Sequence, residues 1–539
     1  MTRAGVLETR AAGRGPGLAV AAAAVALALL TFFQFPGHTW LQQDTQIYAA
    51  ILEHRYDPAV LANDPLAQHP HVAFTLYDEI AIGLRRATGL GFREVLEAQQ
   101  IAARALGIWG LWMLAESLGL ALWPAFAAAA LCSLGASIAA PAVLTFEYEP
   151  SPRAFAVPLI FCAMGLAARG RWMAASLAGS AAFLYHPPTT LPFWPVFVAL
   201  AARRRQWSAL APPAAAAALL LAAARIEGDG STQFFARLGA FEEHLQRLRA
   251  AYVWVSMWPA ARIVHEILLA GLAAGAWARV RAKASQEASI FLLAMAAIGL
   301  ASMPLSWLLL ERMKWSLVPQ IQPMRALLFV SLAAQLLAAV AGLRARGWLP
   351  AFAWLAVAFL IPVQAVWTEP WEPRRTAVAL ALAGLCAAAR GFRGWRAELA
   401  PIVAAFFLFP TAGGVVNYPK LRTPELAQLS AWAREATPRD SVFLFADAGR
   451  GLAPGIFRAE ALRAVYVDWK SGGQVNYLKD FGGEWWFRWQ QTLARGFRPD
   501  DWPRYSGLGI RYVVFETPAP GVAGTPVFTN SRYLVYRVQ

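Results

Sequence analysis

Long apolar runs separated by short polar connections make up most of the first 418 residues. A helix that crosses a bilayer needs about 20 predominantly apolar residues, and on that scale the pattern predicts about thirteen spans. The spans are expected at about 17–33, 98–117, 122–143, 153–168, two short arms within 172–202, 208–224, 255–278, 288–310, 322–343, 348–367, 376–390 and 399–416. This part of the chain is therefore predicted to be a polytopic transmembrane helix bundle.

The run 172–202 is too long for one span and is interrupted by Pro187 and Pro188, next to His186. Proline lacks a backbone N–H and blocks helix continuation, so we expect a hairpin of two short spans whose tip faces outward. A polar residue at membrane depth is a candidate for function, which makes His186 a candidate substrate ligand. The alternative is that His186 only terminates a helix beside the prolines.

Two regions of the chain are polar enough to lie outside the membrane: a first outer loop, 34–97, and a tail, 419–539. Apolar strand patterns alternate with helical patterns in the tail, which indicates a small α/β domain. The expected elements are a helix at 424–436 with Thr423 as its cap, strands at 441–446, 463–468, 510–516 and 533–538, and a helix at about 475–495. The predicted fold class is thus mostly α, with residues 1–418 forming the bundle and 419–539 an extracytoplasmic α/β domain.

Composition and charge agree with a membrane protein rather than a nucleic-acid-binding one. The chain is 58% hydrophobic and 15% charged, with a net charge of +15. The cations fall in clusters between apolar runs: Arg169/Arg171, Arg203/Arg204/Arg205, Arg279/Arg281/Lys283, Arg344/Arg346 and Arg390/Arg393/Arg396. With the predicted spans every cluster lies on the side of the N-terminus, which the positive-inside rule identifies as cytoplasmic. No soluble basic face with interleaved aromatics is present, which argues against nucleic acid as a partner.

The first apolar run, 17–33, has basic residues before it, as a signal peptide does. It ends in 34–37 (Gln-Phe-Pro-Gly) rather than at a small-x-small cleavage site, so we interpret it as an uncleaved span. The three cysteines, Cys132, Cys162 and Cys386, lie in apolar runs and form neither a disulfide framework nor a metal signature.

The first outer loop holds the most informative polar residues. Asp44 follows the first span closely, within 42–48, and Asp64 follows a helix-like stretch; an amphipathic run covers 74–84. With many spans, a large first outer loop, an acidic residue soon after the first span and an outward-facing C-terminal domain, the chain resembles the C-type membrane glycosyltransferase (GT-C) superfamily. The resemblance covers the whole chain as architecture, but as a motif only the neighbourhood of Asp44.

The resemblance implies transfer of a sugar from a polyprenyl-phosphate donor to an acceptor hydroxyl at the outer face of the membrane. Such a reaction needs a carboxylate to accept the acceptor's proton and cations to stabilise the departing phosphate. The implied base is Asp44. Its position also suits a cap of the helix that begins at Thr45, and the two roles are not exclusive.

Candidate phosphate ligands are the cations at the outer ends of spans. Arg325 is favoured, with Arg312 and Lys314 just before it and Arg153 as a weaker case. Arg is costly within a bilayer and is usually functional or paired there, although an interfacial Arg can instead extend to lipid headgroups.

The link before Arg153 carries two acidic candidates. Glu147 and Glu149 could orient a substrate or bind a cation, or they could belong to an ordinary solvated loop. The sequence contains no metal-ligand signature, and a requirement for a divalent cation stays open. The expected partners are a lipid-linked sugar and membrane lipid, with the sugar and the acceptor unidentified.

Two other functions compete with sugar transfer. A transporter places ionisable residues near the membrane midplane on broken, repeated helices, and only the break at His186 fits that description. A non-catalytic assembly protein would use the tail to bind a partner, and would be favoured if Asp44 and Arg325 lay far apart. Protease motifs of the His-Glu-x-x-His and Gly-x-Ser-x-Gly types do not occur.

Overall fold

A computed structural model describes residues 14–69, 74–227, 235–390, 396–413, 421–477, 479–516 and 524–538. The predicted domain boundary at 418/419 and Arg393 of the last predicted Arg cluster lie outside these residues. All element bounds below refer to the described part of the chain.

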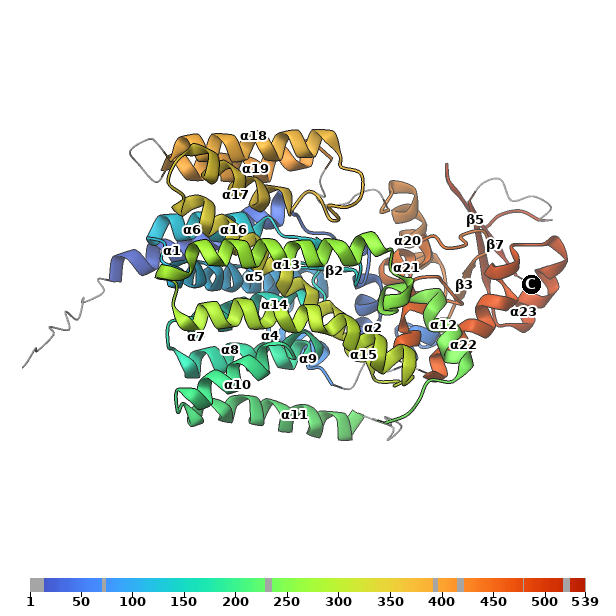
Figure 1. The fold of residues 1–539 in the computed structure, drawn as a ribbon. Coiled ribbons are helices and arrows are strands. Elements are labelled where there is room, and N and C mark those ends of the chain that lie inside the picture. Colours follow the sequence, from blue (N-terminus) through green and yellow to red (C-terminus); the bar gives the residue numbers. More distant parts are fainter. Residues whose placement is uncertain are drawn as a thin grey trace, which may run out of the picture.

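A helix occupies each stretch that was predicted to span the membrane, and Figure 1 shows these helices side by side. They are α1 (Arg14–Phe33), α5 (Phe92–Ser117), α6 (Leu122–Ser133), α7 (Pro152–Ala168), α8 (Trp172–Tyr185), α10 (Phe193–Arg203), α11 (Ala211–Glu227), α13 (Ala260–Val280), α14 (Gln286–Ser306), α16 (Leu328–Arg344), α17 (Trp348–Leu360), α18 (Pro373–Ala389) and α19 (Arg396–Thr411).

Four helical segments of the described residues are long and apolar enough to cross a membrane: Trp207–Ile226, Ala260–Lys283, Gln286–Arg312 and Val318–Arg344. The chain is an integral membrane protein, whereas the number of about thirteen spans stays a prediction made from apolar length.

One of the predicted spans differs in detail, and one predicted break is present. The run 122–143 is not one helix, because α6 ends at Ser133 and Gly135 takes a positive φ of 79°. The chain then forms an antiparallel ribbon of β1 (Ser137–Ile138) and β2 (Val143–Leu144). The run 172–202 is broken as expected, with the short helix α9 (Pro187–Thr190) between α8 and α10.

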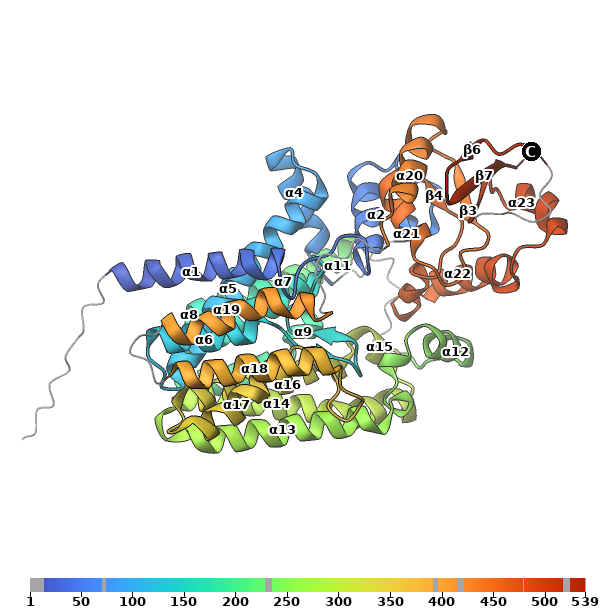
Figure 2. The same cartoon turned by 90° about the horizontal axis from the view of Figure 1, so that it is seen from above.

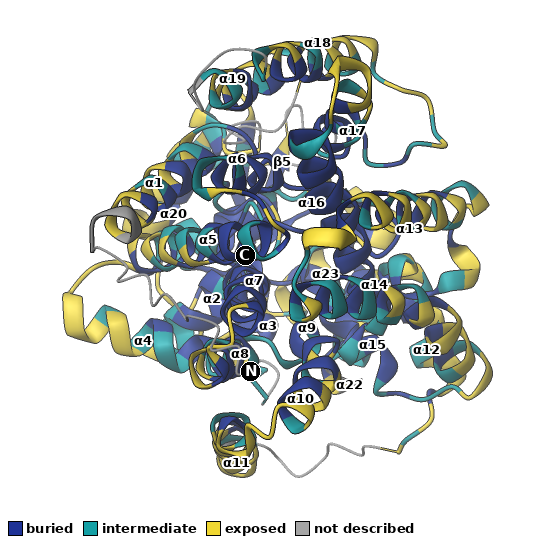
Figure 3. Cartoon of the chain, turned by 60° about the vertical axis from the view of Figure 1, so that its left-hand side comes forward, coloured by how far each residue is buried: buried dark blue, intermediate teal, exposed yellow. Residues whose placement is uncertain are grey.

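The centre of the bundle is built from α16, α7 and α5. The spanning window of α16 is wholly buried, and every residue of α7 is buried. Small residues allow α5 and α7 to approach closely, since a Cβ added at Gly110 would collide with the backbone of Phe161 and Cys162. Figure 3 shows the contrast with α11 and α4 (Tyr77–Thr88), whose exposed residues lie at the rim. This packing fixes α7, whose first turn carries Arg153.

The tail forms the expected α/β unit, with strands shorter than predicted. Its five-stranded sheet has the order β4-β3-β5-β7-β6, in which β3 pairs with β4 and β5 in parallel and β7 is antiparallel to β5 and β6. The elements are α20 (Pro424–Ala436), β3 (Val442–Phe445), α21 (Ala453–Ala461), β4 (Ala464–Val465), α22 (Lys479–Gln491), α23 (Trp502–Gly507), β5 (Tyr512–Glu516), β6 (Phe528–Thr529) and β7 (Tyr533–Arg537). The Thr423 cap is confirmed, because its hydroxyl accepts a bond from Leu426 N at 3.3 Å. Helix α21 was not predicted.

The first outer loop packs against the tail. It contains α2 (Thr45–Tyr56), α3 (Pro65–Gln68) and α4, and Figure 2 shows α2 beside α20 and α21 at one end of the bundle. Ile47, Ile51 and Leu66 of the loop share a buried apolar cluster with Trp485 and Val513 of the tail. The loop and the tail therefore have a common core.

Candidate functional site

A cavity of about 650 Å³ lies where one end of the bundle, the first outer loop and the tail meet. Its lining brings together segments far apart in the sequence: the turn before α2, the link before α7, the helix end at Arg249, the 3₁₀ turn Pro323–Leu327 before α16, and the loop that follows β4. Five of the predicted candidates line it: Asp44, Glu147, Glu149, Arg153 and Arg325.

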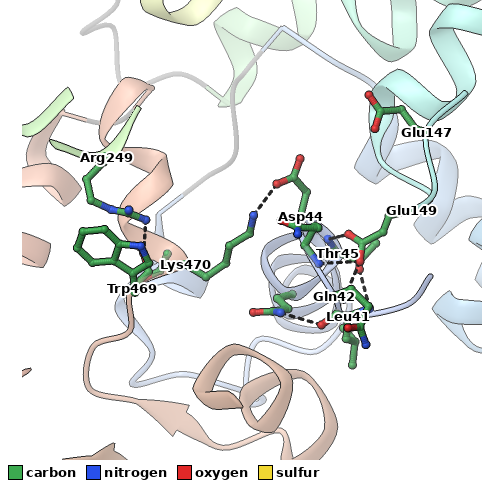
Figure 4. Close-up of polar contacts among 12 residues, drawn as sticks. Leu41, Gln42, Asp44, Thr45, Glu147, Glu149, Arg249, Trp469 and Lys470 are labelled. Atoms are coloured by element: carbon green, nitrogen blue, oxygen red, sulfur yellow. Dashed lines mark hydrogen bonds and ion pairs between the residues drawn. The ribbon is translucent and has the colours of Figure 1, made fainter. Parts of the chain in front are cut away.

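The carboxylate of Asp44 is held by two cations. Its Oδ1 accepts a bond from Lys470 Nζ at 2.8 Å, which Figure 4 shows as a dashed line, and its Oδ2 lies 3.4 Å from Arg153 Nη2. Burial alone would raise the pKa of Asp44, but Lys470 and Arg153 outweigh burial and hold this pKa well below its ordinary value. Asp44 precedes α2, yet its side chain makes no capping bond, which contradicts the capping alternative.

Glu149 supplies the cap that Asp44 does not. Its carboxylate accepts three backbone N–H bonds around the start of α2: from Gln42 N at 2.6 Å, Gln43 N at 2.7 Å and Thr45 N at 2.9 Å. Glu149 is buried rather than solvated. Burial, and next the neighbouring Asp44 charge, raise the pKa of Glu149 above its ordinary value against the effect of the backbone donors. Glu149 thus fixes the turn from which Asp44 projects (Figure 4).

Arg153 and Arg325 differ in the number of partners that their guanidinium groups have within the protein. Arg153 bridges two carboxylates, with its Nε 3.0 Å from Glu147 Oε1 and its Nη2 next to Asp44. Arg325 has no carboxylate within 4.0 Å among the described residues, and its buried Nε has no hydrogen-bond partner there. The guanidinium of Arg325 lies 5.6 Å from the ring centre of Tyr252, another residue of the lining. Arg325 is therefore free to bind an anion.

Two cations of the lining were missed by sequence reasoning. Arg249, which ends α12 (Ala240–Arg249), stacks 3.5 Å over the ring of Trp469 and donates to that residue's carbonyl. Burial lowers the pKa of Arg249 to about 10. Lys470 follows β4, at the carboxyl end of a strand in a parallel part of the sheet. Ligands of open α/β sheets bind at such ends, which is the signal that could have indicated Lys470.

The remaining predicted candidates lie outside the lining of this cavity and have other contacts. His186 accepts a bond from Thr189 N at 3.3 Å and caps α9. Lys314 pairs with Glu243 at 2.8 Å, and the guanidinium of Arg312 lies 4.7 Å over the ring of Trp307. Asp64 is fully buried and pairs with Arg458 of the tail. The function proposed below does not use these four residues.

Within the described ranges, no group of three or more His, Cys, Asp or Glu side chains is arranged to hold a metal ion. The charged groups of the lining that the structure places are four cations, Arg153, Arg249, Arg325 and Lys470, and three carboxylates, Asp44, Glu147 and Glu149.

Comparisons with known proteins give the following similarities. Residues 424–491 match a family described as a domain of unknown function (DUF6798). No curated protein matches the chain. Among solved structures, ArnT from Cupriavidus metallidurans bound to undecaprenyl phosphate is 14% identical, with a TM-score of 0.49 over 98% of this chain and 99% of that one.

Two further structures are similar. AglB, the oligosaccharyltransferase of Archaeoglobus fulgidus, in complex with an inhibitory peptide and a dolichol-phosphate, is 12% identical, with a TM-score of 0.41 over 93% of this chain and 69% of that one. The arabinofuranosyltransferase AftD from Mycobacteria is 16% identical, with a TM-score of 0.44 over 97% of this chain and 40% of that one. All three have the GT-C fold of membrane glycosyltransferases, the superfamily that the sequence resembles.

Proposed function

We propose that this protein is a GT-C-like membrane glycosyltransferase that moves a sugar from a polyprenyl-phosphate donor to an acceptor hydroxyl at the outer face of the membrane. The observation that supports it best is that one cavity holds the carboxylate of Asp44 together with Arg325, a cation that has no carboxylate within 4.0 Å among the described residues. The cavity lies at the end of the bundle, where a phosphate on a lipid and an acceptor from water can meet.

The residues of the lining divide into two roles. Asp44 is the general base, which accepts the proton of the acceptor hydroxyl as its oxygen attacks the anomeric carbon. Arg325 and Arg153 stabilise the charge that develops on the departing phosphate, because guanidinium groups bind phosphate oxygens in pairs. Glu147 keeps Arg153 in place through its Nε, and Glu149 keeps the turn before Asp44 in place.

The relative positions of Asp44 and Arg325 also bear on the competing function, that of a non-catalytic assembly protein. A non-catalytic assembly protein would be favoured if Asp44 and Arg325 lay far apart, whereas both line the same cavity. The electrostatic effect of Arg325 contributes to lowering the pKa of Asp44, so the two charges are close enough to interact.

Substitution of Asp44 tests this function. Asp44→Asn and Asp44→Ala should both reduce transfer by about 100-fold or more, because a general base contributes at least that factor. Both variants should remain folded, since the carboxylate makes no capping bond. The assay measures release of polyprenyl phosphate from a polyprenyl-phosphate sugar in membranes that contain the native acceptor, beside the thermal stability of purified protein.

The matched control is Asp440→Asn, which removes an exposed carboxylate of the tail that pairs with Arg511. It should leave transfer unchanged. Wild-type transfer by Asp44→Asn would remove Asp44 from the chemistry and, with it, the proposed function.

A further inference from the structure

The ion pair between Asp44 and Lys470 presents a chemical difficulty for a base. A general base works best when its pKa lies near the working pH. In the structure both oxygens of Asp44 are occupied by cations, Lys470 at 2.8 Å and Arg153 at 3.4 Å, which makes the carboxylate weakly basic. Something must withdraw a cation from Asp44 before it can accept a proton.

Lys470 is the cation that can move. Arg153 is also tied to Glu147 at 3.0 Å, whereas Asp44 is the only carboxylate within 4.0 Å of Lys470 among the described residues. The Lys470 side chain is a flexible four-carbon stem with three donors, so its ammonium group can turn to a second anion while its backbone stays fixed.

The backbone of Lys470 is held firmly. The preceding Asp468 accepts a bond from Ser471 N at 2.9 Å and pairs with Arg458, and Arg458 pairs with Asp64 of the first outer loop at 2.6 Å. These side chains are almost fully buried. Only the Lys470 stem can therefore move, and it extends into a cavity in which two further cations, Arg249 and Arg325, have no carboxylate partner among the described residues.

We propose that Lys470, a residue of the tail, leaves Asp44 for the phosphate of the lipid-linked donor, so that donor binding releases the base. The inference rests on the proposed function. During transfer the acceptor oxygen bonds to the anomeric carbon and the carbon–oxygen bond to phosphate breaks, leaving its electron pair on the phosphate. The acceptor's proton passes to Asp44, so negative charge moves from Asp44 to the phosphate, which Lys470 has contacted since the donor bound.

Binding of a short-chain polyprenyl monophosphate to the full-length protein in lipid nanodiscs tests the exchange without any transfer step. Lys470→Met should weaken binding by about tenfold or more, since it removes a charge-assisted bond to the phosphate. Asp44→Asn should tighten binding several-fold, because Lys470 then has no competing carboxylate. The tightening should vanish in the Lys470→Met background, where there is no lysine to release.

Glu147→Gln is the matched control for general electrostatics. It also removes a negative charge from the cavity, but from the partner of Arg153 rather than of Lys470. Its effect on binding should persist in the Lys470→Met background. The corresponding polyprenyl alcohol, which lacks the phosphate, should bind every variant alike.

Three results would overturn the exchange: equal phosphate binding by folded Lys470→Met, no tightening by Asp44→Asn, or a tightening that survives the loss of Lys470. If Lys470→Met fails to fold, the Asp44→Asn comparison with wild type decides the question. If the variants show the expected changes in phosphate binding while the wild-type protein transfers no sugar, the phosphate exchange is supported and the proposed glycosyltransferase function is wrong.

Discussion

Two arginines show how the same side chain serves different purposes in this protein. Arg104 of α5 is buried and donates to the carbonyls of Thr31, Gly37 and Glu147, each at 2.8 Å. It therefore joins the end of α1 to the link that precedes α7. Arg325 also lies among buried groups, but its Nε has no partner in the described structure. An unused donor next to a cavity is available to a ligand, whereas a fully bonded one supports the fold.

Substitution of Arg325 should separate binding from folding. Arg325→Ala should weaken binding of polyprenyl monophosphate by about tenfold or more, and Arg325→Lys should weaken it less, because Lys keeps the charge but not the planar fork. Both proteins should unfold at the wild-type temperature. The control, Arg104→Ala, should lower stability by about 3 kcal/mol, since it leaves buried carbonyls unpaired. Equal loss of folded protein in both Arg325 variants would indicate a structural role instead.

At the residue scale the sequence reveals the acidic and basic groups near span ends but not their partners. Asp44, Glu149 and Arg325 were candidates because polar residues beside apolar runs are visible in one dimension. Lys470 was missed because its partner, Asp44, is 426 residues away. The cap of α2 could not be predicted for the same reason. Glu149, and not Asp44, supplies this cap from another segment of the chain, so no local sequence spacing indicates it.

At the scale of elements, the first outer loop and the tail behave as one unit. Asp64 caps α3, pairs with Arg458 of α21 and accepts a bond from Val465 N of β4 at 2.9 Å. Arg458 also pairs with Asp468, so two buried carboxylates share one buried guanidinium. Removing one partner from such a group leaves uncompensated buried charge, which is costly.

Arg458→Met should therefore destabilise the protein by about 3–5 kcal/mol, because Asp64 and Asp468 would lose their shared cation. Thermal unfolding followed by the fluorescence of the tail tryptophans measures this loss. The comparison is Arg511→Ala, which breaks an exposed pair with Asp440 and should cost about 1 kcal/mol or less. A stable Arg458→Met protein would show that the apolar core alone holds the loop on the tail.

The elements with strong apolar periodicity could be predicted, and those determined by tertiary contacts could not. The Thr423 cap and Pro424 located the start of α20 to the residue. Strand β4 covers only Ala464–Val465, although the apolar run continues to Val467, and Asp468 at the end of that run pairs with Arg458. Helix α6 ends early, at Ser133, and Gly135 just beyond it takes a positive φ that the apolar pattern of this run does not reveal.

At the scale of the whole molecule, the two ends of the bundle differ in charge and contacts. At one end Arg169 pairs with Glu116, Arg204 pairs with Glu287, and Arg344 donates to the carbonyls of Leu118 and Val280, both at 3.0 Å. These contacts bring the ends of five helices (α5, α7, α10, α13 and α16) and the start of α14 to the same side. The tail lies at the other end, as Figure 1 shows, and the cavity lies there too, because the tail contributes Lys470 to its lining.

This polarity predicts the orientation in the membrane. Arg and Lys resist translocation, so the end with the Arg clusters should be cytoplasmic and the end with the cavity and the tail extracytoplasmic. The test introduces single cysteines at Gln206, next to Arg204, and at Asp480 in α22, both exposed. The native Cys132, Cys162 and Cys386 are buried and should give little background.

In intact cells a membrane-impermeant maleimide should label the cysteine at 480. It should label the cysteine at 206 only after permeabilisation. An odd number of predicted spans separates the two positions, so labelling of both from the same side would contradict the span count. Labelling of the cysteine at 206 alone in intact cells would place the cavity in the cytoplasm.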